Sequence, residues 1–174
     1  LSGRDRHERM VMLPIFSQAL RDNPKLASIY VGYGDGSFFM VRPLRSEKLR
    51  QIFFAPDNAA YQVWSIDRIS EQRLDSEYLF FDKQLQPISR RQNLKETYDP
   101  RTRPWYNGAL QSQEHFTTAP YAFFSTGEIG TTLARKSTET TVVGADLTLD
   151  DLSATLAEHR LTPSTEVVLY SPDG

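Results

Sequence analysis

The sequence contains no cysteine among its 174 residues, and this absence excludes several kinds of chemistry. Without a thiol there is no disulfide framework, no thiolate nucleophile and no zinc site with cysteine ligands. The chain also lacks an apolar run near the ~20 residues that a membrane-spanning helix needs, and no secretory signal peptide is recognisable. The net charge is only −2, with acidic and basic residues interspersed. This balance offers no electrostatic case for DNA or RNA as a partner.

Motifs of catalysis are missing as well. The three histidines are scattered, and none lies at metal-ligand spacing from another: they are His7, His115 and His159. The chain has no serine-centred nucleophile motif, no phosphate-binding loop ending in lysine and no HExxH sequence. Asp150 and Asp151 are adjacent carboxylates, but a helix N-terminus, where acidic residues are favoured, explains both. We therefore expect no enzyme activity in this chain, no catalytic residues, no cofactor and no metal.

The residues that are present have the composition of a globular domain. Hydrophobic residues make up 39% and charged residues 24% of the chain, as in soluble folded proteins. The length predicts one domain or slightly more than one. The chain starts abruptly at Leu1 in charged sequence and stops at Gly174, so we expect both ends to be cut from a longer protein.

The most distinctive stretch is residues 98–106, which read Tyr-Asp-Pro-Arg-Thr-Arg-Pro-Trp-Tyr. The two prolines fix their own φ angles and push Asp99 and Arg103 towards extended conformations. The stretch is therefore a stiff entry into a helix predicted over 107–113. Arginine offers a planar fork to a carboxylate or phosphate, and Trp105 adds a flat apolar wall. Such residues more often belong to an ordinary core, so these nine residues alone favour the core interpretation over a binding site.

Before this stretch, the pattern predicts a short helix followed by strands. A charged N-terminal segment leads into the helix, which ends at the Asp-Asn-Pro of 22–24. Strand-forming residues over 26–33 and 38–41 flank a Gly-Asp-Gly turn, which indicates a β-hairpin. Further strands are predicted over 61–69 and 77–82, with Trp64 expected to be buried.

After the central stretch, three strands and a helix are predicted. The strands cover 121–125, 129–135 and 140–147, and the helix covers 148–160. Thr148 is a good N-cap, and Asp151, three residues on, completes a capping box. This order of elements predicts an α+β domain built on an antiparallel sheet. Residues 166–174 repeat the pattern of 28–36, a β-rich run ending in Asp-Gly, so a second module is expected to begin near 164.

Asp146 is the outstanding carboxylate of the chain. It follows the apolar run Val-Val-Gly-Ala at 142–145, where an unpaired acid would be costly. A structural partner, such as a backbone amide or an arginine, would explain it. A ligand ammonium group would explain it equally, because an amino acid needs an anion receptor at one end and a carboxylate or aromatic cage at the other.

Three segments together resemble the double Cache (dCache) sensor domains of bacterial receptors. They are 98–106, the Pro-Tyr at 120–121 and Val-Val-Gly-Ala-Asp-Leu at 142–147. The resemblance implies a PAS-like fold with a central antiparallel sheet flanked by helices. It also implies an N-terminal helical segment over 1–23, a membrane-distal module over 24–163 and the start of a truncated membrane-proximal module over 164–174. The phenylalanine-rich segments look most like members with cyclase or phosphodiesterase outputs.

The resemblance further implies a ligand site and a function. The ligand-binding residues of the family's amino-acid-binding members match, in order, Tyr98, Arg103, Trp105, Tyr106, Tyr121 and Asp146. The first three would hold a carboxylate and the last three an ammonium group. The implied function is a periplasmic or extracellular sensor for an amino acid or another small carboxylate or amine, within a membrane-anchored and homodimeric receptor. The alternative is a module whose pocket is filled by its own side chains and which acts through dimer or protein-partner contacts.

Overall fold

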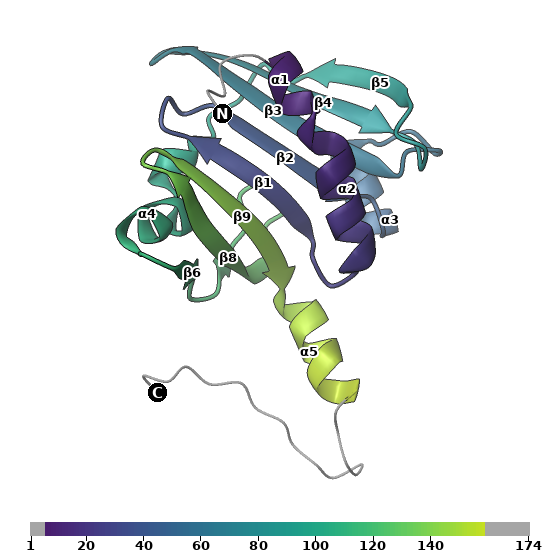
Figure 1. The fold of residues 1–174 in the computed structure, drawn as a ribbon. Coiled ribbons are helices and arrows are strands. Elements are labelled where there is room, and N and C mark those ends of the chain that lie inside the picture. Colours follow the sequence, from purple (N-terminus) through teal and green to yellow (C-terminus); the bar gives the residue numbers. More distant parts are fainter. Residues whose placement is uncertain (1–5, 159–174) are drawn as a thin grey trace.

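A nine-stranded antiparallel sheet forms the centre of the computed structural model, which describes residues 6–158 (Figure 1). The strand order is β5-β4-β3-β2-β1-β9-β8-β6, and β7 pairs with β8 outside this path. The strands are β1 (Ser28–Tyr33), β2 (Phe38–Pro43), β3 (Tyr61–Ser70), β4 (Arg73–Phe81), β5 (Pro87–Gln92), β6 (His115–Thr117), β7 (Tyr121–Ala122), β8 (Ile129–Thr138) and β9 (Thr141–Thr148). The predicted α+β fold with an antiparallel sheet is confirmed.

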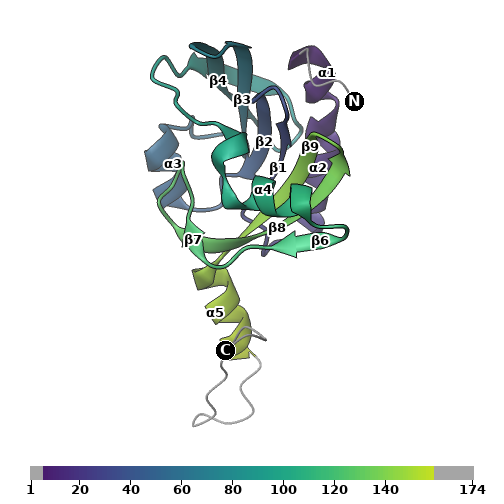
Figure 2. The same ribbon diagram turned by 90° about the vertical axis from the view of Figure 1, so that its left-hand side faces the viewer.

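Helices cover both faces of the sheet. They are α1 (Arg6–Met10), α2 (Met12–Asp22), α3 (Glu47–Phe53), α4 (Pro104–Gln111) and α5 (Leu149–Glu158), with a 3₁₀ turn, η1, at Pro100–Thr102. Figures 1 and 2 show α2 and α4 on opposite sides of the central strands. No helix within residues 6–158 is long and apolar enough to cross a membrane.

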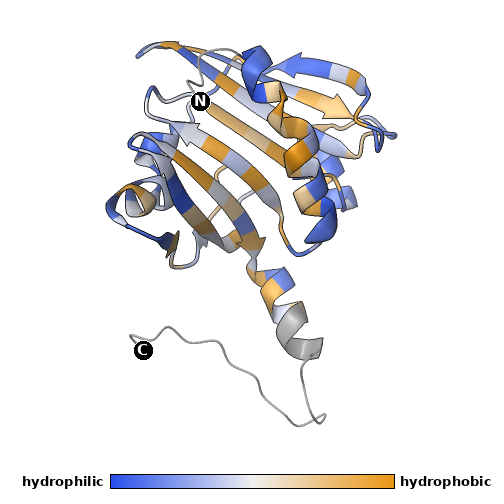
Figure 3. Ribbon diagram, in the orientation of Figure 1, coloured by the Kyte–Doolittle hydropathy of each residue, from blue (hydrophilic) through white to orange (hydrophobic). Residues whose placement is uncertain are grey.

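The two faces carry separate cores, because successive side chains of a strand point to opposite sides. Tyr30, Met40 and Trp64 pack with Trp105 on the α4 face. Ile29, Phe39, Val41 and Val63 pack with Leu13 and Leu20 on the α2 face. Every residue of β1 and β2 is buried as a result. Figure 3 shows the hydrophobic residues gathered along these central strands and α2, while the edge strand β5 is mostly hydrophilic.

Local sequence explains several element boundaries. The predicted hairpin is β1–β2, with Gly36 at φ +86° in its turn, a conformation that favours glycine. Pro104 stands at the start of α4, where its missing N–H costs nothing. At α5, the Thr148 hydroxyl oxygen accepts a 3.1 Å hydrogen bond from the Asp151 N–H, as a helix N-cap does.

Other boundaries differ from the prediction. The helix expected over 107–113 begins earlier, at Pro104, and ends at Gln111, because the proline opens the helix instead of preceding it. The strand expected over 121–125 is only the two-residue β7. The helix α3 was not predicted, although Ser46 caps it by accepting a hydrogen bond from the Leu49 N–H. Residues 159–174, including the expected second module, lie outside the described residues.

Ion pairs attach the N-terminal helix α1 to the sheet. Arg6 lies 2.6 Å from Asp67 on β3 and 3.0 Å from Asp75 on β4, measured between side-chain nitrogen and oxygen. It also contacts Glu77, and the fully buried Arg9 pairs with Asp67. These contacts hold α1 against the end of the sheet where β3 and β4 meet.

Candidate functional site

A small cavity lies between the sheet and α4, on the face that carries the aromatic core. Five of the six residues predicted to bind a ligand line it, namely Tyr98, Arg103, Trp105, Tyr121 and Asp146. They come from the segment before η1, the start of α4, β7 and β9. Residues almost fifty positions apart in the chain therefore converge on one place.

Asp146 forms the polar floor of the cavity and is only 5% exposed. Its Oδ1 accepts hydrogen bonds from the hydroxyls of Tyr30 (2.5 Å) and Thr132 (2.6 Å), and its Oδ2 accepts one from Ser28 (2.9 Å). Ser28 and Thr132 are its cross-strand partners on β1 and β8. The register of three strands thus supplies the hydroxyl donors around this carboxylate.

Burial raises the pKa of Asp146 above its ordinary value. The three hydroxyl donors and the positive charge of Arg42 act in the opposite direction, because they favour the carboxylate form. Burial and the nearby Asp146 also raise the pKa of Tyr121 to about 12. Tyr121 therefore keeps its proton at neutral pH, and its hydroxyl lies 2.7 Å from that of Thr132. Neutral hydroxyls, and no formal cation in direct contact, surround Asp146 among the described residues.

Arg103 lies over the aromatic side of the cavity and is half-buried. Its guanidinium carbon is 5.6 Å from the ring centroid of Tyr121, 5.8 Å from that of Phe124 and 6.0 Å from that of Tyr98. Arg103 also donates a long hydrogen bond, 3.4 Å, to the main-chain oxygen of Ala122. Within the described chain no carboxylate lies within ion-pair distance of it. Its fork is therefore available to an anion.

Trp105 supplies the apolar wall and is 1% exposed. Its ring meets that of Tyr30 edge-on at a centroid distance of 4.8 Å. Because Trp105 packs against the Tyr30 ring, it helps to position the Tyr30 hydroxyl that donates a hydrogen bond to Asp146.

Tyr106 is buried but does not line the cavity. Its hydroxyl donates a 2.7 Å hydrogen bond to the main-chain oxygen of Thr140. Trp105 and Tyr106 are successive residues of a helix, so their side chains leave it about 100° apart. Tyr106 therefore contacts Trp105 but stays outside the cavity that the other five predicted residues line.

Six lining residues were not predicted: Tyr30, Met40, Trp64, Phe123, Phe124 and Ser125. The strand pattern had placed Trp64 in the core, but not beside the candidate site. Tyr30 is the most informative of the six, because it contacts Asp146 directly. Its alternation with Ser28 along β1 was visible in the sequence, whereas the pairing of β1 with β9 was not.

The cavity is nearly filled by the side chains that line it: its volume is about 20 Å³, which is room for roughly one water molecule. Phe124 covers it from outside and is 51% exposed. The Phe124 ring stacks at 6.4 Å from Trp64 and packs at 5.1 Å from Tyr98, both between centroids. A ligand the size of an amino acid needs this cover to move.

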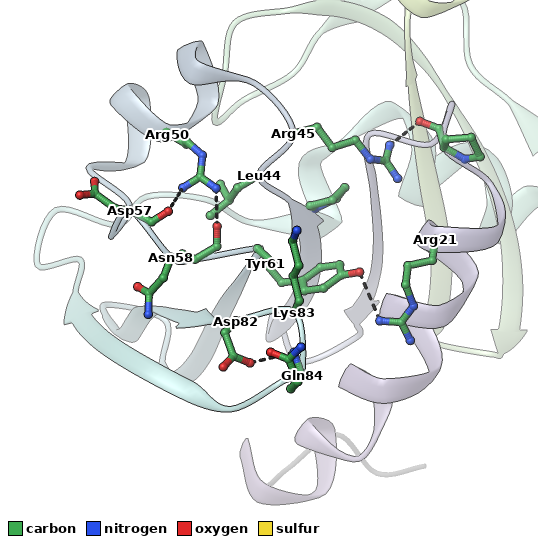
Figure 4. Close-up of a pocket in the computed structure, with 14 residues that line it drawn as sticks. Arg21, Leu44, Arg45, Arg50, Asp57, Asn58, Tyr61, Asp82, Lys83 and Gln84 are labelled. Carbon is green, nitrogen blue, oxygen red and sulfur yellow. Dashed lines mark hydrogen bonds between the residues drawn. The ribbon is translucent and has the colours of Figure 1, made fainter.

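A larger hollow of about 850 Å³ lies elsewhere, between the end of α2, the β2–α3 link and the β4–β5 turn (Figure 4). Its arginines are engaged by the protein itself. Arg45 donates to the main-chain oxygens of Leu20 and Leu26, and Arg50 donates to those of Asp57 and Ala59. These bonds hold loops together. We therefore favour the smaller cavity, where a buried carboxylate and an available guanidinium converge, as the candidate functional site.

Comparison with known proteins finds bacterial relatives. The chain is 33% identical over 150 residues to Adenylate cyclase 1 of Rhizobium meliloti, a match covering 85% of this chain and 23% of that protein. It is 41% identical over 61 residues to the methyl-accepting chemotaxis protein McpG of Pseudomonas putida, covering 34% of this chain and 10% of that protein. The chain thus spans less than a quarter of the length of either relative. No family model matches it.

Among solved structures, the chain is similar to the ligand-binding domain of the Campylobacter jejuni chemoreceptor Tlp3 in complex with 4-methylisoleucine. The TM-score is 0.46 and the identity 18%, over 83% of this chain and 41% of that one. The chain is therefore similar over most of its length to part of a bacterial adenylate cyclase, and over about a third of its length to part of a chemotaxis receptor.

Proposed function

We propose that this chain is the extracytoplasmic ligand-binding sensor domain of a bacterial signal-transduction receptor, and that it recognises an amino acid or another small carboxylate or amine. The observation that carries the proposal is that two opposite charges line one cavity, and neither forms an ion pair among the described residues. Asp146 is buried with hydroxyl partners alone, and Arg103 contacts three aromatic rings. A ligand ammonium group at Asp146 and a ligand carboxylate at Arg103 would neutralise both.

The aromatic residues suit the same ligand. Tyr98, Trp105 and Tyr121 place flat faces around the space between the two charges, and aromatic faces attract cations such as a ligand ammonium group. Tyr106 supports the site indirectly, since its ring packs edge-on at 5.5 Å against Trp105. Ligand entry moves Phe124 and Ser125, which are loop residues between β7 and β8.

The place of the domain in a longer protein is part of the proposal. Residues 1–23 would be the helical segment that leads from the membrane, 24–163 the membrane-distal module and 164–174 the start of a membrane-proximal one. The similarity to an adenylate cyclase, of which this chain covers 23%, supports a cytoplasmic cyclase-type output in the longer protein. The domain itself would bind its ligand without catalysis and would work in a membrane-anchored homodimer.

A thermal-shift screen with amino acids, small carboxylates and amines tests the proposal. A ligand present at a hundred times its Kd stabilises the folded chain by about 2.7 kcal/mol, which a melting curve resolves. Asp146→Asn keeps the side-chain shape but removes the charge, and it should abolish the shift caused by amines. Asp57→Ala, an exposed acid of the larger hollow, is the matched control and should leave the shift unchanged.

Two results would contradict the proposal. If no compound of these classes stabilises the chain, the module with a filled cavity, which acts through dimer or protein contacts, takes its place. If the shift is lost in Asp57→Ala and kept in Asp146→Asn, the ligand binds in the larger hollow instead.

A further inference from the structure

A row of buried polar residues crosses five strands on the sheet face that carries the cavity, and Asp146 is the member that lines the cavity. β3 places Gln62 opposite Arg42 of β2, and β9 places Asp146 between Ser28 of β1 and Thr132 of β8. Ile29 of β1 pairs with Val41 of β2, so the next residues in this register, Ser28 and Arg42, lie side by side. The row is therefore continuous. All five residues are at most 5% exposed. A second row on the same face, two residues away along each strand, contains Trp64, Met40 and Tyr30.

The row carries one cation and one anion, and they do not form an ion pair. β1 separates Arg42 from Asp146, which places their backbones two strand spacings apart, roughly 10 Å. Their side chains lie on the same face of the sheet, the face of Met40 and the cavity. The polar row is therefore negative at β9 and positive at β2.

Arg42 differs from Arg9, the other buried arginine of the described residues, and from the partly buried Arg68. Arg9 pairs with Asp67, and Arg68 lies 3.2 Å from Asp99. Arg42 has only neutral partners: Gln62 (3.2 Å), the sulfur of Met40 (3.2 Å), the hydroxyl of Ser125 (2.6 Å) and the Phe53 ring at 4.6 Å. A fully buried cation without an anion is costly.

Ser125 and Met40 both contact the Arg42 guanidinium and both line the cavity. Ser125 belongs to the loop between β7 and β8 that includes Phe124, the cover of the cavity. When this loop moves to admit a ligand, it takes the Ser125 hydroxyl away from Arg42. Glu128, the carboxylate that ends this loop, is engaged by Lys48 at 3.1 Å. A ligand oxygen can then take the place of the Ser125 hydroxyl.

The charges at the cavity define the ligand that balances them. Arg42 and Arg103 contribute two positive charges and Asp146 one negative charge. We propose that Arg42 is a second anion-recognition residue of the cavity, and that the preferred ligand is an amino acid with an acidic side chain. Its ammonium group pairs with Asp146, one carboxylate with Arg103 and the other with Arg42. This inference rests on the proposed function, because it assigns the ligand class of the same cavity.

Isothermal titration of the chain with glutamate, glutamine, aspartate and asparagine tests the inference. Each acid and its amide have nearly the same shape, so the comparison isolates the second carboxylate. A charge-assisted hydrogen bond to a buried arginine should make the better acid bind on the order of tenfold or more tightly than its amide. Arg42→Met should remove this preference, because it weakens binding of the acid far more than binding of the amide. Arg90→Met, on the exposed edge strand β5, is the matched control and should keep the preference.

Further outcomes separate the two proposals. If an amide or another neutral amino acid binds and neither acid binds better, the inference about Arg42 is overturned and the sensor function stands. If none of the amino acids, carboxylates or amines binds, both fall. Ser125→Ala keeps the test decisive should Arg42→Met fail to fold. It frees an Arg42 N–H and should strengthen binding of the acid, whereas a weaker preference for the acid would overturn the inference.

Discussion

The hydroxyl of Tyr30 lies 2.5 Å from a carboxylate oxygen of Asp146, although the two residues are 116 positions apart in the sequence. The contact exists because β1 pairs with β9, and because Trp105 packs against the Tyr30 ring. It joins the aromatic wall of the cavity to its charged floor. A substitution in the aromatic wall should therefore alter the surroundings of Asp146, and a substitution at Asp146 should alter the packing of the wall.

Gly144→Ala should disturb this contact directly. A Cβ at position 144 would lie 2.3 Å from Cε2 of Tyr30, so the ring must shift. We expect a loss of about 1–3 kcal/mol in the free energy of unfolding, as for other overpacked cores, together with weaker ligand binding. Urea denaturation and titration calorimetry measure the two effects. Gly32→Ala is the comparison variant, because its added Cβ would contact Trp105 instead of Tyr30. Unchanged binding in Gly144→Ala would show that Tyr30 does not position Asp146.

The stability of the empty protein should depend on pH through Asp146. Its pKa is raised in the folded state, so the folded state binds this proton more tightly than the unfolded state does. The contribution is therefore favourable below the unfolded pKa of about 3.9, and stability falls as pH rises from there to the folded pKa. Melting curves of the wild type and Asp146→Asn from pH 4 to pH 8 measure the effect. The wild type should lose stability relative to the variant as pH rises, and a difference that stays constant would contradict the argument.

Arg103→Met should separate binding from stability. Arg103 is half-buried and contacts ring faces and one main-chain oxygen, contacts that contribute about 1 kcal/mol or less at a partly exposed site. We expect a small fall in melting temperature and the loss of carboxylate binding. Arg135→Met, on the exposed side of β8, should change neither. Carboxylate binding that survives in Arg103→Met would assign the anion site to another residue.

Phe124→Ala should open the cavity. The ring is half-exposed and covers Trp64 and Tyr98, so its removal should reduce stability by roughly 1 kcal/mol. Because the cover no longer has to move, ligand association should become faster, as stopped-flow tryptophan fluorescence would show. An association rate that does not change would mean that the ligand enters by another route.

Local sequence determined the elements whose signals lie within a few residues. The Gly-Asp-Gly turn of β1–β2 needs a residue that tolerates positive φ, and Gly36 provides it. The Thr148 cap of α5 depends on one side chain and one N–H three residues away. The stiff stretch before α4 follows from its two prolines. These features required no knowledge of the rest of the chain, which is why the α+β class and the importance of residues 98–106 could be predicted.

Tertiary structure decided what surrounds each charge. Ser28 and Thr132 meet Asp146 because strands far apart in the sequence pair in one register, and a shift of one residue would turn these side chains to the other face. Arg42 lies in the same row of buried polar side chains as Asp146 for the same reason. Tyr106 turns away because α4 begins at Pro104, earlier than predicted, and successive residues of a helix point in different directions. The sequence identifies residues whose side chains could bind a ligand, but the pairing of distant strands determines which of these residues lie close together.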